Sequence, residues 1–135
     1  MLQDVTLKKG DAMTPISTQV LSDGTLVLTP TGPITVSLET DDELLSSFNK
    51  AIEKGHLRIV LDLSETTYMD SSGFAALVRG WTHVRRTGGD VVLARPTQSV
   101  KHLLTITRLR TIIKTSENLD EGLELLRSGV DCLQP

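Results

Sequence analysis

Two short and almost wholly apolar runs set what this sequence can fold into. Residues 57–63 contain three consecutive branched apolar residues, and residues 91–94 form a second run. Such runs are typical of strands that are buried on both faces of a sheet. Each follows a segment with the apolar spacing of a helix, at 40–54 and at 71–86. This alternation predicts an α/β fold with a mixed β-sheet, parallel in its interior, and with helices packed on it.

The N-terminal part of the pattern predicts a hairpin. Residues 16–21 and 26–28 read as two strands, and an Asp-Gly pair between them is a strong turn signal. Pro30 and Pro33 are expected to end regular pairing, because proline cannot donate a hydrogen bond to a ladder. Gly32, which lies between the two prolines, is expected in a turn.

The C-terminal half supplies further elements. Residues 64–67 are predicted to be a polar break before the helix at 71–86. A short helix is expected to begin at Ser99, a strand to occupy residues 111–113, and a last helix to be capped by Asn118.

Length and composition fit one domain in the cytoplasm. The chain has 135 residues, 39% hydrophobic and 23% charged, and domains cluster near ~100–150 residues. We expect an N-terminal arm at 1–13, loosely ordered, and a single domain at 14–130. No apolar run approaches the ~18 residues that would insert into a membrane, and the N-terminus does not read as a signal peptide. The single cysteine, Cys132, excludes an intrachain disulfide.

Several kinds of chemistry lack sequence support. His56, His83 and His102 are scattered without metal-ligand spacing, so no metal is expected. No dinucleotide or phosphate-loop motif is present, so no cofactor is expected. One Trp, one Tyr and two Phe cannot build a base-stacking platform, which argues against nucleic acid. The net charge is −3, but residues 68–115 hold eight bases and two acids, an asymmetry that can orient a docking partner.

The segment Met69-Asp70-Ser71-Ser72-Gly73 lies between an expected strand and an expected helix. Asp and Ser favour helix starts, so the segment can simply cap the helix. A serine hydrolase would need glycine where Met69 stands, and no histidine is marked as its base. A third possibility is a phosphorylation switch, since a serine at a helix N-terminus can accept a phosphate without disturbing the fold.

A family resemblance bears on this choice. Residues 59–64, followed by Tyr68 to Phe74, resemble the STAS domain of anti-sigma factor antagonists. Residues 88–93, 100–106 and 109–113 are similar to later elements of that domain in order and spacing. The resemblance covers roughly residues 14–126 and implies a STAS-like α/β domain.

The resemblance also implies a function. In such proteins the unphosphorylated antagonist binds an anti-sigma factor that is a serine kinase, and the sigma factor is released. Phosphorylation ends binding, and a serine phosphatase resets the protein. The implied phosphoacceptor is Ser71, with Ser72 as the alternative, and the implied loop and partner-binding residues are Asp70, Ser72, Gly73, Phe74 and Thr35.

Two positions differ from the family pattern. Thr35 stands where many members carry an acid, and Arg108 stands where many carry glycine. The resemblance implies no catalytic residue, and a homodimer is compatible with it. Two alternatives stay open: a STAS scaffold, never phosphorylated, in a multi-protein or lipid-transport assembly, and the serine hydrolase.

Overall fold

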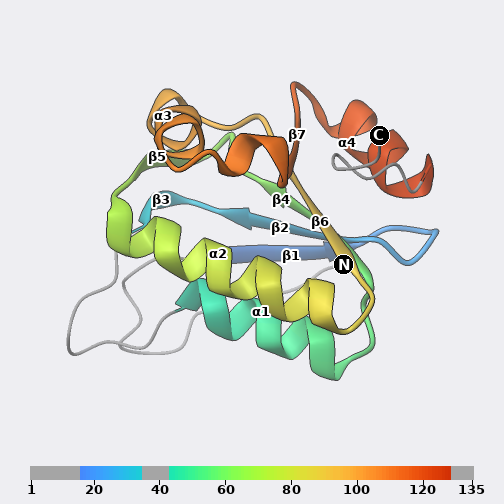
Figure 1. Cartoon of the computed structure of the whole chain (residues 1–135). Coiled ribbons are helices and arrows are strands. Elements are labelled where there is room, and N and C mark those ends of the chain that lie inside the picture. Colours follow the sequence, from blue (N-terminus) through green and yellow to red (C-terminus); the bar gives the residue numbers. More distant parts are fainter. Residues whose placement is uncertain (1–15, 35–42, 129–135) are drawn as a thin grey trace.

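The computed structural model describes residues 16–34 and 43–128, and these form a layered α/β fold (Figure 1). The strands in these ranges are β1 (Ile16–Val20), β2 (Leu26–Pro30), β3 (Gly32–Ile34), β4 (Arg58–Asp62), β5 (Thr66–Met69), β6 (Asp90–Ala94) and β7 (Lys114–Ser116). The helices are α1 (Glu43–Glu53), α2 (Ser71–Arg86), α3 (Gln98–Ile106), α4 (Leu119–Ser128) and the short 3₁₀ helix η1 (Leu109–Thr111).

The described strands form two sheets. The larger has the order β1-β2-β4-β6-β7, and the smaller pairs β3 with β5. In the larger sheet only β1 is antiparallel to its neighbour, while β2, β4, β6 and β7 run parallel. The mixed sheet with packed helices that the sequence predicts is therefore confirmed.

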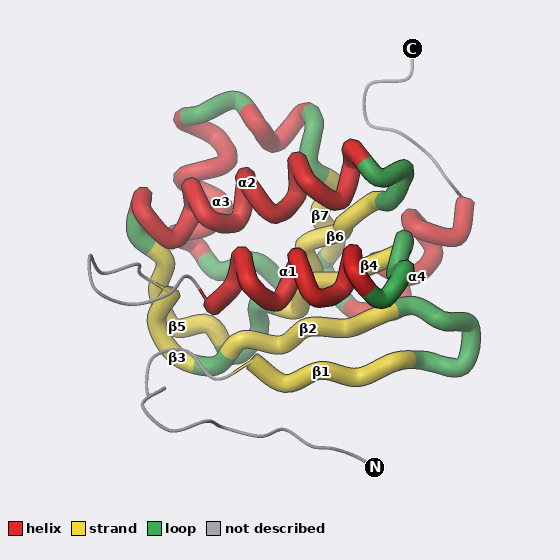
Figure 2. The backbone as a smooth tube through the Cα atoms, turned by 90° about the horizontal axis from the view of Figure 1, so that it is seen from below, coloured by secondary structure: helices red, strands yellow, loops and turns green. Residues whose placement is uncertain are grey.

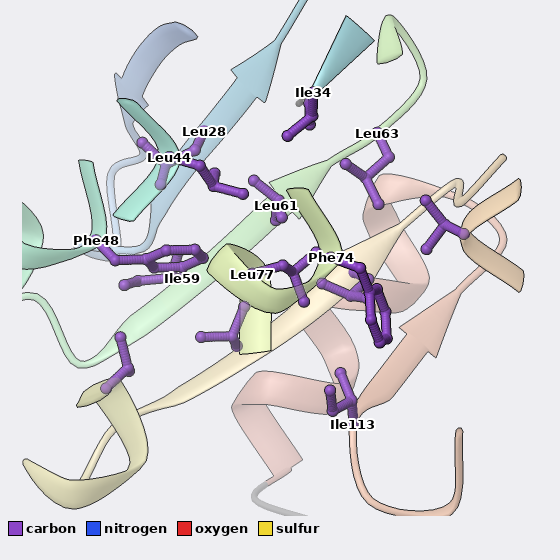
Figure 3. Close-up of a cluster of buried hydrophobic side chains, with 14 of the residues drawn as sticks. Leu28, Ile34, Leu44, Phe48, Ile59, Leu61, Leu63, Phe74, Leu77 and Ile113 are labelled. Atoms are coloured by element: carbon purple, nitrogen blue, oxygen red, sulfur yellow. The ribbon is translucent and has the colours of Figure 1, made fainter. Parts of the chain in front are cut away.

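Side-chain alternation along the strands builds two apolar layers. On one face, residues such as Ile59 and Leu61 of β4 pack against Phe48 of α1 and Leu77 of α2 (Figure 3). On the other face, Val60 packs with neighbouring strand valines and with α4. Figures 1 and 2 show α1 and α2 side by side on one side of the sheet, with α4 on the other. The central strands are thus buried on both faces, as their apolar runs predict.

The expected end of pairing is found at Pro30, the last residue of β2, but was wrong at Pro33, which pairs with Tyr68. Strand β2 extends through Pro30, and Gly32 and Pro33 belong to β3 rather than to a turn. Pro30 lies beyond Leu28, the last β2 residue registered with β4, so its missing N–H breaks no bond there. A register shift between Gly32 and Pro33 accommodates the second proline.

The polar break at 64–67 was also misplaced, because Thr66 and Thr67 begin β5. Thr66 is buried, and its hydroxyl donates to the Pro30 carbonyl at 3.4 Å, which satisfies a polar side chain inside the fold. The segment therefore connects two strands directly.

The last strand does not occupy 111–113 but begins at Lys114. Ile113 is fully buried in the bend before it. Lys114 is only 4% exposed, and its ammonium group pairs with the carboxylate of Asp90, which also contacts Arg85. A lysine can occupy this strand because its charge has a partner, a condition that the hydrophobic pattern does not reveal.

Helix starts differ slightly from expectation. Helix α3 begins at Gln98 rather than at Ser99, and the Thr97 hydroxyl caps it by accepting from the Val100 N–H. Helix α1 is described from Glu43, so its expected start at residue 40 lies outside the described residues. The expected arm at 1–13 lies outside them as well.

Candidate functional site

The candidate site is the turn between β5 and α2. Asp70 is the N-cap of α2, with extended backbone angles, and its Oδ1 accepts from the Gly73 N–H at 2.9 Å. The Ser72 hydroxyl donates to the same Oδ1 at 2.7 Å. The Asp70 carbonyl accepts from the Phe74 N–H, which starts the helical ladder. The expected cap of this helix therefore forms, with Asp70 as its residue.

These contacts favour the charged form of Asp70. The Gly73 N–H holds the pKa of the Asp70 carboxyl below its usual 3.8, and the Ser72 hydroxyl adds to this, while partial burial opposes it. A negative charge at Asp70 also suits the positive end of the α2 dipole. The turn thus carries one fixed carboxylate beside its two serines.

The two serines differ in their surroundings. Ser71 is the first residue of α2 and is exposed, and within the described ranges its hydroxyl has no hydrogen-bond partner. Ser72 is half-buried, and its hydroxyl is engaged with Asp70. A reagent or enzyme approaching from solvent therefore meets the Ser71 hydroxyl first.

Gly73 and Phe74 anchor the turn from inside. The backbone of Gly73 lies so close to β3 that a Cβ atom there would sit 2.2 Å from the Ile34 carbonyl oxygen. Phe74 is 5% exposed and points into the core, as Figure 3 shows. Both residues hold the first turn of α2 in place rather than presenting side chains to solvent. Thr35, which follows Ile34 in the chain, lies outside the described residues.

One residue that the sequence reading had not singled out lies beside the turn. Tyr68 of β5 is 51% exposed, whereas its neighbour Met69 is buried. Along β5, Thr66 and Met69 are buried, whereas Thr67 and Tyr68 are both exposed. Strict alternation would instead place Tyr68 on the same face as the buried Thr66, so the sequence pattern alone does not identify Tyr68 as exposed.

The STAS domain family matches residues 18–122, most of the chain. The chain belongs to the STAS domain family. A Thermotoga neapolitana protein, described as a candidate anti-sigma factor antagonist and homologue of TM1081, is 32% identical over 77 residues, which cover 57% of this chain and 68% of that protein. A Thermotoga maritima protein with a similar description is 29% identical over 80 residues, covering 59% and 71%.

Solved structures agree with this STAS fold. The crystal structure of the Thermotoga maritima protein matches with a TM-score of 0.69 and 24% identity, covering 83% of this chain and 94% of that one. The anti-sigma factor antagonist SpoIIAA in its unphosphorylated form matches with a TM-score of 0.64 and 15% identity, covering 85% and 99%. The single STAS-like domain that the resemblance implies is therefore confirmed as a fold.

A second polar feature of this STAS domain lies at the carboxyl ends of β4 and β6. The Arg95 guanidinium donates to both Asp62 oxygens, at 2.7 and 3.3 Å. Burial of Asp62 would raise the pKa of its carboxyl, but the Arg95 hydrogen bond and the Ser64 N–H outweigh burial and lower it. Asp62 and Arg95 thus bond to each other, and this ion pair links the carboxyl ends of β4 and β6.

The histidines of the STAS domain do not gather at Ser71. His83 lies more than three helical turns after Ser71 in α2, and its Nδ1 is 3.2 Å from the Asn49 side-chain oxygen. In the described part of the chain, no hydrogen bond joins a histidine to Ser71, and no group of three metal-ligating side chains occurs. None of the described helices is long and apolar enough to cross a membrane.

Proposed function

We propose that this STAS domain is an anti-sigma factor antagonist that is switched by phosphorylation of Ser71. In the unphosphorylated form it binds a serine-kinase anti-sigma factor in the cytoplasm and so releases the sigma factor. The kinase phosphorylates Ser71 and ends binding, and a serine phosphatase restores it. The family membership and the antagonist descriptions of its relatives support the partner class.

The observation that carries this proposal is the exposed hydroxyl of Ser71 at the start of α2, which has no hydrogen-bond partner among the described residues. Ser72 is the alternative acceptor, but its hydroxyl would have to leave Asp70 before it could react. Met69 and Phe74 are buried on either side, so the acceptor is presented on a fixed turn rather than on a flexible tail. The exposed ring of Tyr68 next to it offers apolar contact area to a partner.

A phosphate on Ser71 should change binding more than folding. It would add about −1.5 to −2 charges at pH 7, and the positive end of the α2 dipole favours negative charge at this position. A partner docked on this turn would instead have to bury or face that charge. A loss of 2–4 kcal/mol, roughly 30- to 1000-fold in affinity, is typical for an unpaired interfacial charge.

The test uses the anti-sigma kinase recovered from native cells with the Ser71→Ala chain as bait. The full chain is treated with the purified kinase and ATP, the phosphate is mapped by mass spectrometry, and binding of both forms is titrated. The proposal expects phosphate on Ser71 and much weaker binding afterwards. Phosphate mapped elsewhere, or unchanged binding of the phosphorylated chain, would contradict it.

We further propose that the STAS domain is not itself an enzyme. The residues around Ser71 supply no base, since the nearest described ionisable group, Asp70, is engaged as the helix cap. The purified chain is expected to show no turnover on ester, phosphate or peptide substrates. Esterase activity that disappears in Ser71→Ala would favour the serine hydrolase instead.

A further inference from the structure

The outer edge of β1 is a second surface of the described fold at which another protein chain could bind. Strand β1 is the terminal strand of the larger sheet, and among the described residues it pairs only with β2. Figure 2 shows it along one border of the fold, away from α2. An edge strand presents a row of backbone N–H and C=O groups that can pair with another strand.

The hairpin fixes which residues present those groups. The Leu21 N–H donates to the Thr25 carbonyl at 2.8 Å, so Leu21 is a hydrogen-bonded partner in the β1–β2 ladder. In an antiparallel pair, hydrogen-bonded and non-hydrogen-bonded residues alternate. Counting back from Leu21, the N–H and C=O groups of Ile16, Thr18 and Val20 therefore point away from β2, toward the free edge.

The side chains of β1 lack the devices that usually block such an edge. The strand is Ile16-Ser17-Thr18-Gln19-Val20, with no charge, no proline and no bulge in its register with β2. Soluble proteins commonly protect edges with lysine, proline or a bulge. In addition, Val20 is 56% exposed, an unusual position for a branched apolar side chain in a strand.

We propose that a second copy of the chain occupies this edge, with β1 pairing antiparallel to β1 about a two-fold axis through Thr18. The strand is self-complementary in this register. Ile16 of one copy faces Val20 of the other, and Ser17 faces Gln19, so apolar meets apolar and polar meets polar. Thr18 faces Thr18, which is the isologous arrangement that a two-fold dimer requires.

The register also satisfies the outward backbone groups. The three residues with outward groups, Ile16, Thr18 and Val20, meet one another across the axis, and each pair can exchange both N–H···O=C bonds. The two five-stranded sheets would become continuous across the dimer. The turn with Ser71 is not used, so this interface is independent of the proposed function.

Five paired residues make a small interface, so we expect a weak dimer with a dissociation constant of roughly 10 µM to 1 mM. The first measurement is sedimentation equilibrium of the full chain across that range. A chain that stays monomeric up to about 1 mM overturns the proposal, and this includes the case in which residues 1–15 cover the edge themselves.

Charge at the axis tests the register. Thr18→Lys places two ammonium groups opposite each other and is expected to weaken self-association at least about tenfold, since like charges directly opposite destabilise a strand pair. The matched control is Gln19→Lys, an exposed neighbour that would face Ser17 instead, and it should retain self-association within about threefold. Equal losses in both variants would overturn the two-fold register.

Mixing two oppositely charged variants of Thr18 tests the two-fold pairing directly. Thr18→Lys and Thr18→Glu should each self-associate at least about tenfold more weakly than the wild type, since like charges directly opposite destabilise a strand pair. Their melting temperatures should be unchanged, because Thr18 is exposed in the monomer. An equimolar mixture should form a heterodimer at least as strong as the wild-type dimer, since opposite charges then meet at the axis. Failure of the mixture to associate would overturn the proposal even if each variant alone is monomeric.

Discussion

Gly73 at the start of α2 lies against the main chain of Ile34 in β3, two segments that are 39 residues apart in the sequence. A Cβ atom on Gly73 would stand 2.2 Å from the Ile34 carbonyl oxygen and 2.8 Å from its carbonyl carbon. The neighbour is backbone, so it cannot give way by a change of rotamer. This contact ties the turn that holds the serines to the smaller sheet.

We predict that Gly73→Ala destabilises the domain by about 1–3 kcal/mol, the usual cost of forcing atoms into a close-packed site. The comparison is Ser71→Ala, which adds no atom and lies on the exposed side of the same turn, and which should change the melting temperature little. Chemical denaturation of both variants gives the difference. Equal stability of Gly73→Ala and the wild type would contradict the close approach.

The capping carboxylate gives a pH-dependent prediction. The folded-state pKa of Asp70 is lowered below 3.8, so the unfolded chain binds a proton more readily at this residue. Its contribution to stability is therefore fully present above pH ~4 and is lost as pH falls through the folded pKa. Asp70→Asn keeps an acceptor but removes the charge, so its stability deficit should be present at pH 7 and vanish at low pH.

NMR titration of the Asp70 carboxyl carbon offers a direct check of the cause. Ser72→Ala removes the hydroxyl that donates to Oδ1 and should raise the pKa of Asp70 toward its ordinary value. An unchanged pKa in Ser72→Ala would mean that the hydroxyl does not contribute. A stability gap between wild type and Asp70→Asn that does not narrow as pH falls below about 4 would contradict the linkage.

The central strands are the part of the fold that the sequence predicted best. Val60 and Val92 are fully buried, as their uninterrupted apolar runs indicated. Burying a valine is worth about 1.5–3 kcal/mol. Val60→Asp would lose the free energy gained by burying the valine side chain, and it would add an unpaired buried charge. We therefore expect the free energy of unfolding to fall by more than about 3 kcal/mol.

The matched control for this substitution is Leu57→Asp. Leu57 directly precedes the same strand but is 50% exposed, so its carboxylate can stay hydrated. The loss there should stay below about 1 kcal/mol. Thermal melts of both variants by circular dichroism decide the matter, and a Val60→Asp chain that melts within a degree or two of the wild type would refute the burial of β4.

The parts of the fold that could not be predicted from the sequence depend on pairing between distant segments. The smaller sheet joins Pro33 to Tyr68, and Lys114 enters a strand because Asp90 neutralises it. Neither partner is visible in local periodicity, which reports only whether a side chain is apolar. At the site, the motif predicted the helix start and its serines. Only the structure shows that the Ser72 hydroxyl is engaged with Asp70, while the Ser71 hydroxyl has no partner within the described ranges.

Arg108 provides a test of backbone strain. It stands where the family resemblance implies glycine, and its φ of 65° and ψ of 16° lie in the left-handed region. This conformation costs an L-residue roughly 1 kcal/mol or more. Arg108→Gly should therefore stabilise the domain by about 0.5–1 kcal/mol, although the greater freedom of glycine in the unfolded chain offsets part of the gain.

Arg110→Gly is the control for this change. It removes the same type of exposed side chain two residues later, inside η1, where the backbone is not left-handed. That substitution should leave stability unchanged or lower it by up to about 1 kcal/mol. Urea denaturation gives the free energy of unfolding of each variant relative to the wild type. A lower free energy of unfolding for Arg108→Gly would contradict backbone strain at Arg108.

The last prediction concerns the proposed switch without any kinase. Ser71→Glu places one carboxylate where the phosphate would lie, and the first turn of α2 tolerates it because the helix dipole favours negative charge there. The melting temperature should stay within about 2 °C of the wild type, while affinity for the anti-sigma kinase falls at least about tenfold. Ser71→Ala should bind like the wild type but accept no phosphate.

The matched control is Gln98→Glu, which puts the same charge on the exposed first residue of α3. It gains the same dipole interaction but lies on another helix, so binding should change by no more than about threefold. Isothermal titration of the three variants against the kinase separates a local effect at Ser71 from a general effect of net charge. If Gln98→Glu weakened binding as much as Ser71→Glu, the loss would reflect overall charge, and the turn between β5 and α2 would not be the switch.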